Sequence, residues 1–183
     1  MLGSIVLMPI ETGTHKIGPS NGSLKIKTGK EGAAAKMGHD LVLGVGSWEA
    51  TVEGGDSPSI SLTADPGSVD VLEGSGGAKA LSDKDKGDIK KSIMGKVLGG
   101  SEITFTSSAV EDNGGQLVCK GDLSIAGKST PVSIPLSTNG GSVSGSVKLS
   151  QKDFGIKQFS AMMGALKVSD QVEVLIEGQV PTS

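Results

Sequence analysis

The sequence of 183 residues predicts an all-β fold, an eight-stranded antiparallel up-and-down barrel with one main helix and an apolar loop at its mouth. Three observations predict it. Apolar and polar residues alternate along most of the chain, short polar turns separate the alternating runs, and each run is apolar on one face only. Leu117, Cys119 and Leu123, for example, share one face of a run whose other face carries Lys120 and Asp122.

About eight runs show this alternation, and glycine-rich turns at 54–56, 113–115, 127–129 and 139–141 connect several of them. The runs cover residues 24–28, 39–52, 59–64, 103–106, 117–125, 132–136, 143–149 and 172–177. The second run changes phase, because its apolar residues occupy odd positions up to Val45 and even positions from Trp48. A shift of one residue exchanges the faces of a strand, so we expect a bulge at residues 44–46.

Two longer segments depart from the strand pattern. Residues 82–98 predict a helix that begins with a capping box of Ser82 and Asp85, carries an apolar stripe and ends at Gly99. Residues 154–166 are apolar and too long for a hairpin turn, so they predict a loop at the mouth, which either caps the core or lines a cavity. A short helical turn is expected near residues 33–37.

Composition excludes several classes of protein. The net charge is −3 and arginine is absent, which argues against binding of nucleic acid. No run reaches the roughly 18 apolar residues of a membrane span. A single cysteine excludes an intrachain disulfide framework, and the apolar residues 1–10 lack the marks of a signal peptide, so we expect a cytoplasmic protein. Residues 1–12 are expected to form an N-terminal arm and residues 13–180 a single barrel domain.

Several segments, in order and spacing, resemble the YceI-like family. They are residues 121–132 (GDLSIAGKSTPV), 152–156 (KDFGI), 168–174 (VSDQVEV) and 103–107 (ITFTS). Residues 38–41 (GHDL) and Trp48 are similar to the branch of the family found in actinobacteria. The resemblance implies an eight-stranded barrel with a helix outside and a polyisoprenoid or similar apolar lipid, such as an isoprenoid quinone, inside; it leaves a homodimer open.

The inward residues support a ligand-binding role independently. They are mostly small or aliphatic, and a barrel of about eight strands either fills with such side chains or holds one small ligand. An empty apolar cavity destabilises a protein, whereas hydrocarbon gains about 0.8 kcal/mol for each buried CH₂. We therefore expect a protein that carries or stores a long apolar ligand; the alternative is a barrel that packs solid and serves as an interaction module.

The candidate ligand-binding residues supply shape and exclude water rather than perform chemistry. They are Leu41, Leu43, Trp48, Leu62, Phe105, Leu117, Cys119, Leu123, Phe154, Phe159, Met162, Met163 and His39. His39 is either a polar partner for the head group of the ligand or, as we favour, a hydrogen-bonded residue at the rim. Trp48 either packs within the barrel or projects into the cavity, and Cys119 is expected to be a buried small apolar residue.

An enzyme is not expected. The sequence shows no nucleophile elbow, no pair of carboxylates in an apolar setting and no recurring spacing of metal ligands, so no catalytic residue, cofactor or metal ligand is assigned. A third hypothesis is an enzyme that modifies an isoprenoid with His39 and Asp40.

Overall fold

The computed structural model describes residues 12–77, 79–113, 116–139 and 141–180. Most of the predicted N-terminal arm therefore lies outside the described residues. Eleven strands form one antiparallel sheet, and three short ones form a second sheet. The large sheet contains β1 (Gly13–Ile17), β2 (Gly22–Thr28), β4 (His39–Val45), β5 (Trp48–Gly54), β6 (Ser59–Ala64), β7 (Val69–Gly76), β8 (Ile103–Asp112), β9 (Gln116–Ile125), β10 (Lys128–Asn139), β11 (Ser142–Ser150) and β14 (Gln171–Gln179). The small sheet contains β3 (Lys30–Glu31), β12 (Ser160–Ala161) and β13 (Leu166–Val168).

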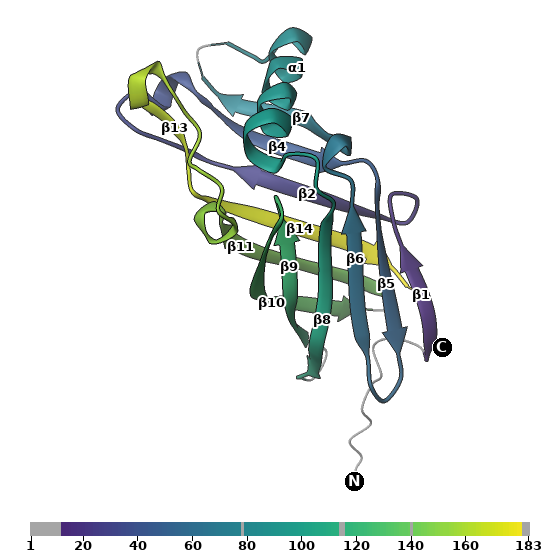
Figure 1. Cartoon of the computed structure of the whole chain (residues 1–183). Helices are drawn as coiled ribbons and strands as arrows, with labels where there is room; N and C mark the ends of the chain where they lie inside the picture. Colours follow the sequence, from purple (N-terminus) through teal and green to yellow (C-terminus); the bar gives the residue numbers. More distant parts are fainter. Residues whose placement is uncertain (1–11, 78, 114–115, 140, 181–183) are drawn as a thin grey trace.

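The eleven strands make eight long segments around a ring, which we call paths. Three of these paths bend, and each is divided into two strands: β1 and β2, β4 and β5, and β6 and β7. The paths of β1 with β2 and of β4 with β5 run antiparallel along their whole length, from Gly13 opposite Gly54 to Thr28 opposite Leu41. The path of β6 with β7 continues the ring through β8, β9, β10, β11 and β14. Pairing of β14 with β2 closes it, which confirms the predicted up-and-down architecture (Figure 1).

The phase change in residues 39–52 is confirmed. Leu43 and Val45 are buried on β4, Trp48 and Ala50 are buried on β5, and the exchange takes place at a bend at residues 46–47. The expected bulge is elsewhere. The register of β4 against β7 shifts between Val42 and Leu43, so the extra residue is Leu72 on β7. A bend between two strands shifts the apolar residues from odd to even positions, just as a bulge does. The alternation in the sequence therefore could not distinguish a bend from a bulge.

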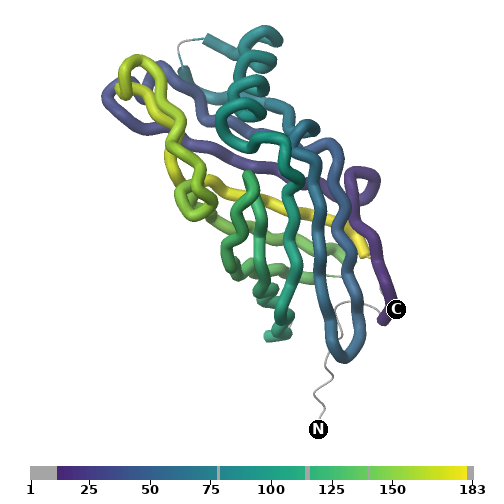
Figure 2. Tube along the Cα trace, in the orientation of Figure 1, coloured from purple at the N-terminus to yellow at the C-terminus, as the bar shows by residue number. Residues whose placement is uncertain are grey.

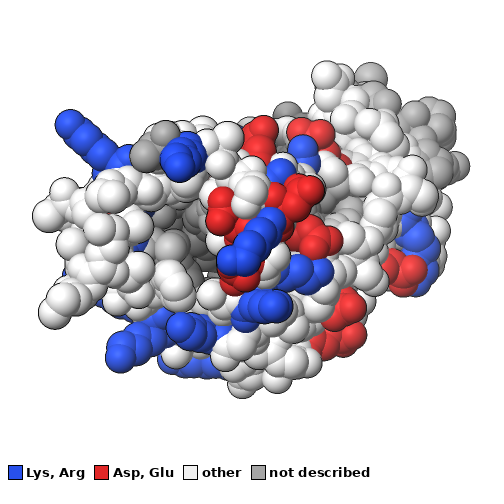
Figure 3. Space-filling view, turned by 90° about the horizontal axis from the view of Figure 1, so that it is seen from above, with Lys and Arg blue, Asp and Glu red and all other residues white. Residues whose placement is uncertain are grey.

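The predicted helix forms in two parts. α1 (Asp83–Ser92) begins with the capping box, in which the Asp85 amide donates to Ser82 Oγ at 3.1 Å and the Ser82 amide donates to Asp85 Oδ2 at 3.0 Å. The chain then continues as a wider π-helical segment, η3 (Ile93–Leu98), and ends at Gly99 with a φ of 65°. α1 lies across one end of the barrel, where basic and acidic side chains intermingle (Figure 3).

Short 3-10 helices complete the structure: η1 (Ala35–Met37), η2 (Pro66–Ser68), η4 (Gln151–Phe154) and η5 (Met162–Gly164). The first is the expected turn near residues 33–37. The tube view shows that residues 160–168 reach out beside the loop that follows β2, at the same end of the barrel as α1 (Figure 2). The turn after β9 is Ala126–Gly127 rather than residues 127–129, and both residues have positive φ, as a two-residue hairpin of type I′ requires.

Candidate functional site: an apolar cavity beneath the helix

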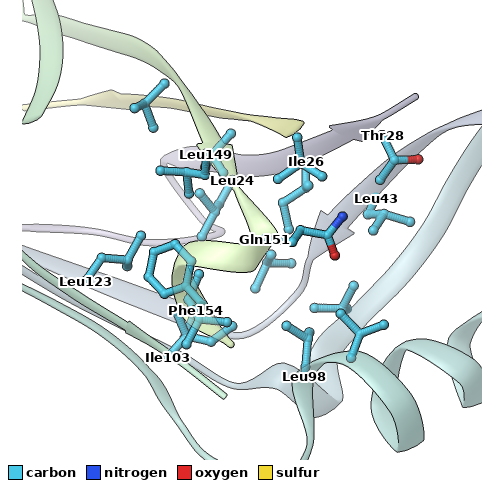
Figure 4. Close-up of a pocket in the computed structure, with 18 of the residues that line it drawn as sticks. Leu24, Ile26, Thr28, Leu43, Leu98, Ile103, Leu123, Leu149, Gln151 and Phe154 are labelled. Carbon is cyan, nitrogen blue, oxygen red and sulfur yellow. The ribbon is translucent and has the colours of Figure 1, made fainter. Parts of the chain in front are cut away.

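The barrel encloses a cavity of about 440 Å³ that extends beneath α1 and η3. Side chains from β2, β4–β11 and β14 form its wall, while α1, η3 and residues 151–168 cover it. The lining is almost entirely aliphatic, and it includes all three phenylalanines of the chain, Phe105, Phe154 and Phe159. Figure 4 shows aliphatic side chains facing one another across the space, with the Phe154 ring on one side.

Eight of the residues predicted from sequence line this cavity. They are Leu41, Leu43, Leu62, Phe105, Cys119, Leu123, Phe154 and Phe159. Their alternation places them on the inner face of the barrel, and the apolar segment 154–166 contributes its first half to the lining. That segment therefore both covers the core and borders the cavity.

The structure places the other five predicted residues elsewhere. Trp48 and Leu117 are buried in the core and do not border the cavity. Met162 is half exposed and Met163 is fully exposed, and neither borders the cavity. His39 stands at the β4–β7 edge, where its Nε2 lies 2.7 Å from the Lys79 carbonyl. Because a carbonyl oxygen only accepts, that ring nitrogen donates, as expected of a hydrogen-bonded residue at the rim.

Many lining residues were not singled out from the sequence, although their signal was present. The helix contributes its apolar stripe of Ile89, Ile93, Val97 and Leu98. The strands contribute further alternating residues: Leu24, Ile26, Val45, Ala50, Ile60, Ala64, Val69, Ile103, Ile125, Ile134, Leu136, Val147, Leu149, Val172, Val174 and Ile176. Alternation identifies the inner face, and the inner face is the common property of these residues.

Four lining residues carry an oxygen or nitrogen in the side chain: Thr28, Asp88, Ser92 and Gln151. Gln151 projects among apolar side chains, between Phe154 and Leu43 (Figure 4), and its Nε2 donates to the Ser169 carbonyl at 3.0 Å. The Ser169 amide in turn donates to the Gly29 carbonyl, next to Thr28. Thr28 Oγ1 is buried and has no hydrogen-bond partner in the described part of the chain. A buried hydroxyl without a partner costs about 1–3 kcal/mol, so this end of the cavity suits a polar atom of a guest.

Cys119 lies on the cavity wall with a relative exposure of 1%. Burial in apolar surroundings raises the pKa of its thiol from 9.0 to about 11, because the thiolate is poorly solvated there. The thiol is therefore protonated at neutral pH and behaves as a small apolar residue.

The arrangement of His39 and Asp40 does not favour chemistry on a guest in the cavity. They are consecutive residues of β4, so their side chains point to opposite faces of the strand. Across the described residues no group of three His, Cys, Asp or Glu side chains is placed to hold a metal ion. Within that same portion of the chain, no helix has the length and apolar character to cross a membrane.

The sequence and the fold are similar to those of known proteins. A family model described as the YceI-like domain matches residues 16–180. The chain is similar in structure to Burkholderia cenocepacia BcnA, with a TM-score of 0.63 and 18% identity over 88% of this chain and 97% of that one. It is also similar to a Campylobacter jejuni YceI protein, with a TM-score of 0.54 and 15% identity over 77% of this chain and 84% of that one. A variant of the latter, crystallised with a monobromobimane guest, gives a TM-score of 0.55 with the same identity and coverage. Comparison with curated proteins found no match.

Proposed function

This chain belongs to the YceI-like family, and from that premise and its cavity we propose that it binds and carries or stores a long apolar lipid inside the barrel. The family is known for binding polyisoprenoids, and we propose a polyisoprenoid or an isoprenoid quinone-like lipid as the ligand. The observation that carries the proposal is the open apolar cavity of about 440 Å³ within an otherwise closed barrel.

The size and lining of the cavity favour hydrocarbon. An apolar cavity of about 150 Å³ in another protein stays dry and binds benzene, so a space of 440 Å³ accommodates roughly three groups of that size. That corresponds to a chain of about 15–20 carbons, and a longer lipid would extend through the mouth beneath the helix. Branched aliphatic walls with three phenylalanine rings suit the methyl-branched outline of an isoprenoid.

The polar lining favours a neutral head group. Thr28 Oγ1 and the amide of Gln151 offer hydrogen bonds to an alcohol or a carbonyl oxygen. Among the described residues, the one charged residue of the lining is Asp88, which pairs with Lys84 at 3.9 Å, so the lining itself offers no cation to an anionic group. The chain has no arginine to hold a diphosphate through paired hydrogen bonds. For a head group that lies inside the cavity, we therefore favour a prenol or a quinone over a prenyl diphosphate.

The alternatives from the sequence receive less support. A barrel that packs solid would leave no space of this size, and an enzyme that uses His39 and Asp40 would need both side chains beside the cavity. The cytoplasmic location and a homodimer stay predictions, which cell fractionation and light scattering would test.

The test is to purify the protein gently, extract it with organic solvent and identify the released lipid by mass spectrometry. We expect a prenyl lipid at a molar ratio near that of the protein. Repeated recovery of no apolar molecule, together with no uptake of added prenol, would overturn the proposal.

A matched pair of variants on β11 controls for nonspecific adsorption. Val147 lines the cavity, whereas its neighbour Ser146 is exposed on the outer face. Val147→Trp should occupy part of the cavity and reduce the amount of bound lipid or the length of chain that is held, while Ser146→Trp should retain the lipid of the unaltered protein. Equal lipid content in the two variants would place the lipid on the outside of the barrel.

A further inference from the structure

Two loops at one end of the barrel form a surface that the lipid-binding cavity does not explain. We define this end lobe as residues 32–38 (GAAAKMG) and 160–166 (SAMMGAL). The loops lie against each other, since the Ala34 amide donates to the Ala165 carbonyl at 2.8 Å and Leu166 packs beside Gly38. The two loops contain a single charged residue, Lys36.

The end lobe gathers most of the large exposed apolar side chains of the described residues. Met37 has a relative exposure of 57%, Met162 of 50% and Met163 of 106%, and Leu72 on β7 is the fourth such residue. Large apolar side chains that cluster on the surface mark sites of contact with another apolar phase. Methionine is suited to such contacts because its side chain is flexible and polarisable.

The backbone holds two of these methionines outward. Met162 and Met163 have φ values of 54° and 56°, a left-handed conformation that is unfavourable for residues other than glycine, asparagine and aspartate. Gly164 follows with a φ of 89°. The tight turn directs both side chains to solvent, although the cavity lies within reach of the same segment.

The charge around the end lobe is predominantly positive. Lys30, Lys36, Lys157 and Lys167 lie on it or beside it, against Glu31, which accepts a hydrogen bond from Gln158, and the exposed Asp40. The four ion pairs found among the described residues involve none of these lysines. Seen from above, the end of the molecule that carries β13 is mostly white, with blue at its edges and no red (Figure 3).

The end lobe is also joined directly to the cavity. Thr28 and Leu41, which line the cavity, flank the first loop, and Phe159 and Val168, which also line it, flank the second. An apolar environment that contacts the end lobe would therefore lie next to one end of the cavity.

From this combination we propose that the end lobe docks on the surface of an anionic lipid bilayer. Met37, Met162 and Met163 would enter the acyl boundary, and the surrounding lysines would contact anionic head groups, as in other proteins that lie on a membrane. Docking itself goes beyond the proposed function; only its use, the passage of lipid between bilayer and cavity, rests on that function.

The experiment is co-sedimentation of the full chain, stripped of lipid, with vesicles of phosphatidylcholine alone or with phosphatidylglycerol. We expect binding to the anionic vesicles that weakens as salt increases. The double variant Met162→Asn and Met163→Asn should bind about tenfold more weakly while remaining folded, because asparagine tolerates the left-handed conformation. Lys36→Gln should weaken binding about fivefold and reduce its salt dependence. Leu72→Asn, the matched control, should bind as the unaltered protein does.

Three outcomes would overturn the docking proposal: no binding to anionic vesicles, equal binding by the double asparagine variant, or a dimer in solution that this variant dissociates. The last outcome would show that a second copy of the chain covers the end lobe. Lipid extraction from the cavity is measured separately. A protein that retains a prenyl lipid but ignores vesicles would therefore contradict the docking and leave the proposed function intact.

Discussion

The two ends of the barrel are built from the same alternating strands and yet differ in their interior. At the end away from α1, buried side chains of Ile17, Val52, Leu117, Val143 and Val180 belong to the core without bordering the cavity. We call this the closed end. At the other end, a helix and a loop cover the opening in place of inward side chains, and the cavity remains. The difference shows that the covering elements, more than the strands, decide where a barrel is hollow.

The largest test of this comparison uses two leucines of β9. Leu117 lies at the closed end and Leu123 borders the cavity, and both are buried. Leu117→Ala should cost about 3–5 kcal/mol, because it creates a void in close-packed surroundings. Leu123→Ala should cost about 2 kcal/mol in the lipid-free protein, since its side chain already lacks neighbours on one side. Urea unfolding measures both; equal costs would indicate that the two ends are packed alike.

These two leucines also show what the sequence could predict. Alternation identified the inner face of β9, and Leu117, Cys119 and Leu123 all lie on it. The sequence could not tell that Leu117 falls beyond the cavity and Cys119 within it, because that depends on how far η3 and residues 151–168 extend over the opening. The same limit applies to Met162 and Met163, whose apolar character predicted a lining position. Their positive φ values, which turn them outward, follow from the tight turn and from the pairing of β12 with β13.

The fold was more predictable than the site. Eight strand paths, the phase change before Trp48 and the capping box of Ser82 and Asp85 all follow from local patterns. The small sheet of β3, β12 and β13 did not, because its strands are two or three residues long and β3 pairs with β13 across most of the sequence. Such short pairings depend on the tertiary structure rather than on local propensity.

The cavity wall should also respond to pH through Cys119. Its folded pKa is about 11, against 9.0 for the thiol outside the fold. Between these values the unfolded chain loses the proton and the folded protein keeps it, so the free energy of unfolding should fall as pH rises. The expected slope is about 1.4 kcal/mol per pH unit over that window, and the contribution is fully present below pH 9.

The measurement is urea unfolding from pH 8 to 10.5 of the unaltered protein and of Cys119→Ala, which lacks the thiol and is otherwise identical. The two proteins should differ in slope above pH 9. Parallel curves would mean that the thiol is solvated and that the cavity wall at β9 is wet.

The smallest effect concerns the helix that covers the open end. Ser82 caps α1, and its hydrogen bonds lower the pKa of the Asp85 carboxyl below 3.8, so the cap persists at neutral pH. Ser82→Ala should reduce stability by about 1 kcal/mol and should increase amide hydrogen exchange within α1 more than in β9. Uniform protection in the variant would show that the cover and the strands open together.

The central claim is that the open end holds an apolar chain in a space of limited length. Isothermal titration of the lipid-free protein with prenyl alcohols of increasing length tests it most directly. We predict that affinity rises with each isoprene unit and levels off at about 15–20 carbons, once the cavity of 440 Å³ is filled. Affinity that does not depend on chain length would contradict the account. So would a series in which no alcohol gives binding heat and none competes with another apolar ligand for the cavity.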